Sequence, residues 1–177
     1  MAVEGNLQKL AILEPSLGSN YKTIEKVAGY IAAGVAPGTY SCLQNGGLVA
    51  SGVGNSQLPS SIFLAAADFT DYAKVPKLKV RAQVACNATA VGTTTFSVGF
   101  YPVTVAGAAG LLAYTLGTVV PGSTVTPAAV ASTVASADSG DFAIPADGQY
   151  LLAIVIGVAS TAVNSVTGVT AQLMVHV

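Results

Sequence analysis

The feature that most restricts the fold of this chain is a succession of short segments in which apolar and polar residues alternate. Alternation with a period of two is typical of a β-strand with one buried and one exposed face. Residues 78–86 and 169–176 show the pattern, and residues 96–101 repeat it around Phe96, Val98 and Phe100. These segments therefore predict strands that pack one face against a core.

Counted along the chain, such segments predict about eight strands. Turn residues separate them, among them Asn45-Gly46-Gly47, Pro121-Gly122 and Asp147-Gly148. This spacing predicts an all-β fold, an antiparallel β-sandwich that is jelly-roll-like, with an immunoglobulin-like sandwich as the alternative. Pro102 is expected to end its strand or to place it at an edge. The expected strands are 40–43, 48–53, 62–66, 78–86, 96–101, 111–120, 150–158 and 169–176, and residues 123–137 form a weak strand or a long loop.

The first 38 residues differ from the rest and predict an N-terminal arm, with the β-sandwich domain at 39–177. An apolar patch precedes Pro15 and consists of Leu7, Leu10, Ile12 and Leu13. Residues 23–33 predict one short helix, because Ile24, Val27, Ala28 and Ile31 recur at helical spacing and Gly34 follows them.

Charged residues are few and unevenly placed. They number 15, or 8% of the chain, where an average globular protein has about 25%. Residues 27–67 and 82–137 contain none. A net charge of −1 with seven basic residues does not suit a nucleic-acid partner, and the low polarity argues against disorder. Two interpretations remain: uncharged strands between charged loops, or uncharged faces that contact other subunits.

The sequence predicts neither a membrane segment nor a secretory signal peptide. The longest apolar run, from Tyr150 to Val163, is shorter than the 18–20 residues that a spanning helix needs, and we expect a buried strand and a turn there. The first residues are of mixed polarity, with Glu4 and Lys9 near the start.

Groups suited to catalysis are scarce, and we expect the protein not to be an enzyme and to have no cofactor, metal ion or small-molecule substrate. His176 is the single histidine. The aspartate pairs Asp68/Asp71 and Asp138/Asp141 are typical of turns before strands, although paired carboxylates also serve glycosidases. A calcium site from Asp138, Asp141 and Asp147 is a further alternative.

Two other groups of residues have both a structural and a functional interpretation. Cys42 and Cys86 are expected to be small buried thiols, with a disulfide between them left open. The basic cluster of Lys74, Lys77, Lys79 and Arg81 forms either one polar strand face with its loop or a contact for an acidic partner.

Residues 58–177 resemble a family of small virion structural proteins of tailed bacteriophages, found among capsid decoration, minor capsid and minor tail proteins. The resemblance lies in the segments LPSSIFLAAADFTDY, KLKVRAQVACNATA, FSVGFYPVTVAG, YTLGTVVPGSTV, SGDFAIPADGQYLLAIVIG and AQLMVHV. It implies a jelly-roll-like module on the virion, commonly assembled as a homotrimer. It implies no individual functional residues.

Taken with the low charge, the resemblance leads to the expectation of a capsid decoration protein on the capsid exterior, made in the host cytoplasm. Its partner would be the major capsid protein lattice. The predicted contact residues are Leu7, Leu10, Ile12, Leu13, Lys74 and Lys77. A tail fibre or minor tail protein that contacts the host surface is the alternative, and a secreted hydrolase or lectin is a third.

Overall fold

The structure is a computed structural model that describes residues 21–29, 35–60, 63–64, 77–86, 96–108, 110–128, 133–143, 146, 148–157 and 166–176. These residues form strands, turns and loops, and none of them is helical. Eleven strands follow one another: β1 (Tyr21–Gly29), β2 (Gly38–Cys42), β3 (Leu48–Ala50), β4 (Gly54–Asn55), β5 (Phe63–Leu64), β6 (Leu78–Cys86), β7 (Phe96–Ala108), β8 (Leu111–Leu116), β9 (Val134–Asp138), β10 (Gln149–Ile156) and β11 (Val166–His176).

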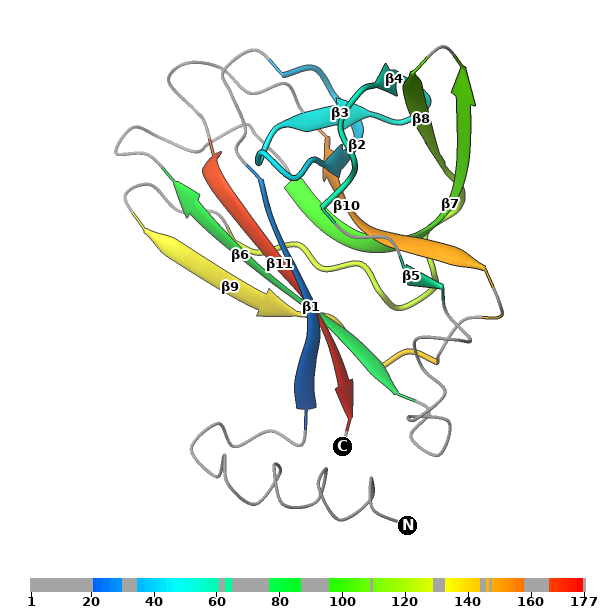
Figure 1. Ribbon diagram of the computed structural model, residues 1–177. Helices are drawn as coiled ribbons and strands as arrows, with labels where there is room; N and C mark the ends of the chain where they lie inside the picture. The colour runs from blue at the N-terminus through cyan, green and yellow to red at the C-terminus, as the bar shows by residue number, and fades with distance from the viewer. Residues whose placement is uncertain are drawn as a thin grey trace.

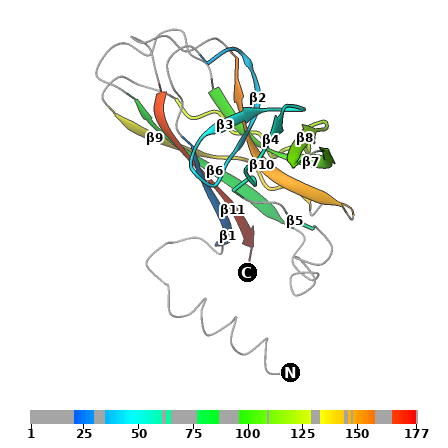
Figure 2. The ribbon, with the colours of Figure 1, turned by 45° about the horizontal axis from the view of Figure 1, so that its top comes forward.

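The strands form two antiparallel sheets that pack against each other (Figure 1). One sheet has four strands in the order β1-β11-β6-β9. The other has the order β3-β2-β10-β7-β8-β4, with β5 also paired to β10. Figure 2 shows the same two layers from a second direction. An antiparallel β-sandwich, as the sequence predicts, is confirmed.

The pairing pattern is that of a jelly roll. When the short strands β3, β4 and β5 are set aside, the first long strand pairs with the last, β1 with β11. The second then pairs with the seventh (β2 with β10), the third with the sixth (β6 with β9), and the fourth with the fifth (β7 with β8). The chain is thus one long antiparallel ribbon, folded so that successive pairs fall in opposite sheets. The immunoglobulin-like alternative has a different strand order.

The main core lies between the two sheets and draws its side chains from the predicted alternation. Leu78, Val80, Ala82 and Val84 are fully buried, whereas Lys79, Arg81 and Gln83 between them face outward. β11 contributes its alternate residues in the same way. The opposite sheet supplies Val98, Phe100, Leu152, Ile154 and Ile156. Tyr150 stacks on Phe100 with ring centroids 5.2 Å apart.

β10 is buried on both faces, which explains why its sequence is continuously apolar. Leu152 and Ile154 enter the main core, whereas Leu151 and Ala153 point to the other side and join a second cluster. That cluster also contains Leu43, Val49, Val103 and Tyr114. The connection between β2 and β6 supplies part of it, because residues 43–60 fold across the outer face of the seven-stranded sheet.

Hydrogen bonds attach this connection to the sheet beneath it. The amide of Gly52 donates to the Tyr114 carbonyl (3.0 Å), and the amide of Leu116 donates to the Ser51 hydroxyl (2.9 Å). The Tyr114 hydroxyl donates to the carbonyl of Gln57 (3.2 Å). The predicted turn at Asn45-Gly46-Gly47 is also present: it joins β2 to β3, and Gly46 takes a φ of 82°.

The helix predicted at 23–33 is wrong, because residues 21–29 form β1 at an edge of the four-stranded sheet. A register shift between Thr23 and Glu25 places Ile24 as an extra residue in the strand. Ile24 and Val27 both contact the core. Because of the shift, these two inward residues are three positions apart, which is a helical spacing, and not the two positions of a regular strand. Ala28, which a helix would bury with them, is exposed. The sandwich therefore includes residues of the predicted arm.

Pro102 does not end its strand, since β7 continues to Ala108. Residues 96–102 pair with β10, and residues 103–108 pair with β8. Pro102 stands where β7 changes partners, and its carbonyl accepts a hydrogen bond from Gly117 (2.9 Å). A proline that donates no hydrogen bond suits this position.

Two serine hydroxyls take the place of backbone acceptors beside the long strands. The amide of Val80 in β6 donates to the Ser139 hydroxyl (2.9 Å), and the amide of Phe100 in β7 donates to the Ser123 hydroxyl (3.1 Å). A few residues after each serine, the segment that contains it pairs with the same strand through backbone groups again. Phe142 pairs with Leu78 of β6, and Val125 pairs with Val98 of β7.

Candidate interaction surface

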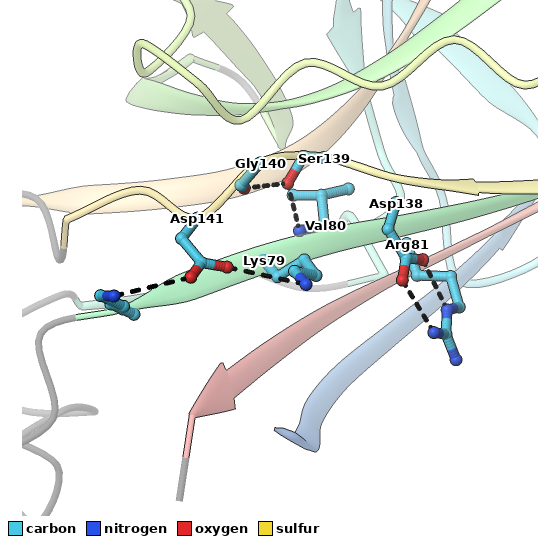
Figure 3. Close-up of polar contacts among 8 residues, drawn as sticks. Lys79, Val80, Arg81, Asp138, Ser139, Gly140 and Asp141 are labelled. Atoms are coloured by element: carbon cyan, nitrogen blue, oxygen red, sulfur yellow. Dashed lines mark hydrogen bonds and ion pairs between the residues drawn. The ribbon is translucent and has the colours of Figure 1, made fainter. Parts of the chain in front are cut away.

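Two groups of ion pairs occupy the outer face of the four-stranded sheet (Figure 3). The Arg81 guanidinium on β6 contacts the Asp138 carboxylate on β9 with two hydrogen bonds, of 2.6 and 2.8 Å. Asp141, in the loop after β9, lies 3.8 Å from the Lys77 ammonium and 3.6 Å from that of Lys79. Pairing of β6 with β9 brings Arg81 directly opposite Asp138.

The arginine changes the acidity of its partner. The hydrogen bonds from Arg81 hold the pKa of Asp138 below its usual value, aided by the positive charges of Arg81 and Lys79, while partial burial opposes this effect. The same pair raises the pKa of Arg81. Both groups are ionised near neutral pH, and they form a salt bridge at the sheet surface.

The predicted basic cluster is thus neutralised in large part within the chain. Lys77, Lys79 and Arg81 all lie beside carboxylates, which agrees with the interpretation of a polar strand face. Lys77 keeps 57% of its side chain exposed, and its contact with an acidic partner stays a prediction. Lys74 lies outside the described residues.

The carboxylates of the predicted calcium site have other partners. Asp138 is held by Arg81, and Asp141 lies between two lysines. Asp147 lies outside the described residues, as do Asp68 and Asp71. Within the described ranges, no group of three or more histidine, cysteine, aspartate or glutamate side chains is placed to hold a metal ion.

Among the residues that the structure describes, charge is confined to one of the two layers. In the described strands, all charged residues belong to the four-stranded sheet, and Lys77 and Asp141 flank that sheet. The seven-stranded sheet, with the described segments 43–60 and 117–128 that pack on it, contains no charged residue. We call this second layer the uncharged layer.

Three of the four exposed large apolar side chains that the structure describes lie on the uncharged layer, and the fourth, Val134, lies on β9 of the other sheet. Val53 is 51% exposed, Leu58 54% and Leu111 49%. Leu111 lies next to β4, because Gly54 pairs with Ala113 and a β-carbon at Gly54 would be 3.5 Å from the Leu111 β-carbon. A face that combines exposed apolar groups with neutral polar groups is suited to contact with another protein.

The sequence reasoning did not single out Val53, Leu58 or Leu111. The available signal was their place inside the charge-free stretches 27–67 and 82–137. Those stretches also contain buried strands, and only the fold separates exposed from buried residues.

Of the two cysteines and the histidine, the structure describes the side chain of Cys42 alone. Cys42 is buried and forms no disulfide, and burial raises the pKa of its thiol to about 12. A protonated thiol in the core fits the predicted structural role. Cys86 and His176 lie at the ends of β6 and β11, and their side chains are outside the described part of the structure.

The predicted contact residues of the arm, Leu7, Leu10, Ile12 and Leu13, also lie outside the described residues. Over the ranges that the structure describes, it contains no helix of the length and apolarity that crossing a membrane requires.

No protein-family model matches the chain, and no curated protein matches it. Among solved structures, a chain of the native virion of Kashmir bee virus at neutral pH is similar over 88% of this chain and 69% of that one. The identity is 10% and the TM-score 0.31. This similarity carries no weight for function, and it is the strand order of the chain itself that defines the jelly roll.

Proposed function

We propose that the protein is a bacteriophage virion structural protein, a capsid decoration protein that binds the major capsid protein lattice and stabilises it. The observation that carries the proposal is the uncharged layer with its exposed Val53, Leu58 and Leu111. Such a face favours binding to other subunits, because no charge on it has to lose its hydration when the contact forms. The proposed protein is not an enzyme and acts through binding alone.

The fold is suited to this task. A jelly roll of two packed sheets presents a rigid surface, and jelly rolls recur in viral capsid proteins as well as in lectins. When many copies bind a repetitive lattice, their individually weak contacts combine into a high overall avidity. Each copy would bridge neighbouring capsid subunits and bury area that resists the pressure of packaged DNA. Assembly as a homotrimer on the capsid exterior belongs to the proposal through the resemblance described above.

Copy number in the purified particle separates this proposal from its alternative. A decoration protein is present in on the order of hundreds of copies, whereas a tail fibre or minor tail protein is present in roughly three to twelve. Quantitative mass spectrometry against the major capsid protein gives the number. Fewer than a few tens of copies would reject decoration in favour of the tail.

Binding to empty capsids tests the surface itself. Leu111→Glu replaces an exposed apolar side chain of β8 with a charged one. We expect this variant to bind empty capsids at least tenfold more weakly. Gln83→Glu is the matched control, since Gln83 is exposed on the outer face of the other sheet and the same charge is added there. Equal binding by both variants would reject the uncharged layer as the contact.

The N-terminal residues are tested separately. Deletion of residues 1–15 removes Leu7, Leu10, Ile12 and Leu13 together. We expect weaker binding to empty capsids, because the predicted apolar patch would lie on the lattice or on a neighbouring subunit. Unchanged binding would remove the arm from the proposal and leave the uncharged layer as its basis.

A further inference from the structure

The edges of the two sheets differ in how they are protected against pairing with another chain. An edge strand presents unpaired backbone groups, and proteins protect such edges with charges, bulges or very short strands. The ends of the described strand orders are β1 and β9 in one sheet and β3 and β4 in the other.

Three of these four edges are protected. β1 carries Lys22, Glu25 and Lys26 and contains the irregularity at Ile24. β3 has three residues and β4 has two, so neither offers a length of backbone on which a further strand could pair.

β9 lacks these protections. Its sequence is Val134-Ala135-Ser136-Ala137-Asp138, with no proline, no lysine and one charge, at the end, that Arg81 already neutralises. Within the described residues β9 pairs on one side only, with β6, and Figures 1 and 2 place it at the margin of the molecule. Val134 is 72% exposed, the largest value among the exposed large apolar side chains that the structure describes.

We propose that β9 pairs antiparallel with β9 of a second copy of this chain, with Ser136 facing Ser136 of the other copy. The two four-stranded sheets then join into one continuous sheet. In this register Ala135 faces Ala137 of the other copy, and Val134 faces its Asp138, so the paired side chains are small enough to fit.

The single charge of β9 selects this arrangement over the parallel one. Antiparallel pairing places the two Asp138 side chains at opposite ends of the contact. Parallel pairing in register would put them side by side, and like charges on neighbouring strands are destabilising. Antiparallel self-pairing is also twofold symmetric, so both copies use the same surface and the contact closes after two copies.

This contact is separate from the proposed function and does not depend on it. A twofold contact does not form a trimer, so in a trimeric protein it would join one trimer to another. Because it concerns copies of this chain alone, it can be tested in solution without capsids.

Disulfide trapping tests both the contact and its register. In a Cys86→Ser background, Ser136→Cys places two thiols on facing residues. Facing residues of antiparallel strands have α-carbons about 4.5–5.5 Å apart, within the range that a disulfide spans. We expect Ser136→Cys to form a covalent dimer under mild oxidation, whereas Val134→Cys and Asp138→Cys each form little alone. Mixing the last two should give the crosslinked pair, because residues 134 and 138 face each other.

The single-cysteine variants serve as controls for one another. In the proposed register two Val134 positions lie about 13 Å apart, too far for a disulfide. A Ser136→Cys variant that crosslinks no faster than Val134→Cys would overturn the proposal, whether the cause is a different register or the absence of the contact.

A second variant tests the contact without a covalent bond. Ser136→Lys places two ammonium groups opposite each other, and its side chain is exposed, so the fold is retained. Gln83→Lys adds the same charge on the same face one strand further in, since Gln83 pairs with Ser136. We expect the first to lower the self-association measured by sedimentation velocity and the second to leave it unchanged. Equal effects, or a wild-type protein without self-association, would overturn the proposal.

Discussion

Among the described residues three serine side chains are buried, and their hydroxyls have different surroundings. Ser123 and Ser139 accept hydrogen bonds from strand amides and donate to nearby carbonyls. Ser41 on β2 is 1% exposed, and its hydroxyl has no hydrogen-bond partner within the described structure. A buried polar group without a partner costs about 1–3 kcal/mol, so these serines act on stability in opposite directions.

The same substitution is therefore expected to have opposite effects at two positions. Ser41→Ala removes an unpartnered hydroxyl and should raise the free energy of unfolding by about 1 kcal/mol. Ser139→Ala leaves the buried amide of Val80 without its acceptor and should lower that free energy by about 1–3 kcal/mol. Urea denaturation measures both, and a loss of stability in Ser41→Ala would contradict the assignment.

The Arg81–Asp138 pair predicts a dependence of stability on pH. The pKa of Asp138 is lower in the folded chain than in the unfolded chain. Its contribution is therefore present above the unfolded pKa of about 4 and is lost as the pH falls through the folded pKa. Because Asp138 is 34% exposed, the contribution is at most about 1 kcal/mol.

Asp138→Asn tests this contribution through the difference in unfolding free energy from the wild type. We expect a measurable destabilisation at pH 7 that shrinks toward zero near pH 2. A difference that is the same at both pH values would show that the carboxylate charge is not its source.

At the level of elements, Gly29 allows β1 to pack against the opposite sheet. A β-carbon at this position would lie 3.0 Å from the Cys42 sulfur and 3.3 Å from both the Ile154 Cδ1 and the Leu48 Cδ2 atoms. Glycine inside a strand commonly marks such a close approach.

Gly29→Ala is expected to lower the free energy of unfolding by about 1–3 kcal/mol, because the added methyl group overpacks the core. Gly140→Ala is the control, since a β-carbon there meets no atom within 4 Å. Combining Gly29→Ala with Cys42→Ala should recover part of the loss, as Cys42 is the nearest neighbour. Additive losses in the double variant would contradict this packing explanation.

The elements also show how far the sequence can predict this fold. β6 matches its predicted bounds of 78–86, because strict alternation on a half-buried strand gives a strong signal. β1 was predicted as a helix because the extra residue at Ile24 changes the spacing of its inward residues from two to three. Strand order, which brings Arg81 to Asp138 across 57 residues, is a property of the fold that local patterns do not contain.

The candidate site was predicted less completely than the fold. The charge-free stretches indicated that some uncharged face exists, and the sandwich assigns it to one layer. The same stretches could not show that Leu111 is exposed while Tyr114, three residues later, is buried, because both side chains lie on one short strand whose surroundings come from distant residues.

In the whole molecule, Cys42 lies where the two layers meet, and this position predicts its reactivity. Its thiol is buried, with a pKa raised to about 12, so little thiolate forms at neutral pH. In a Cys86→Ser variant, we expect a thiol reagent to label Cys42 only when the sandwich opens. The labelling rate should rise with urea in parallel with unfolding, and fast labelling in the absence of urea would contradict the buried position.

The confinement of charge to one layer, among the described residues, also has a consequence for rates. A partner that approaches the uncharged layer is not attracted over long distances, so association should proceed at an unsteered rate of roughly 10⁵–10⁶ M⁻¹s⁻¹. Salt screens interactions between charges and has little to act on here, so this rate should be nearly the same in dilute and concentrated salt. The rate at which subunits bind would then depend on their concentration and on the number of vacant binding sites. It would depend little on the ionic strength of the medium.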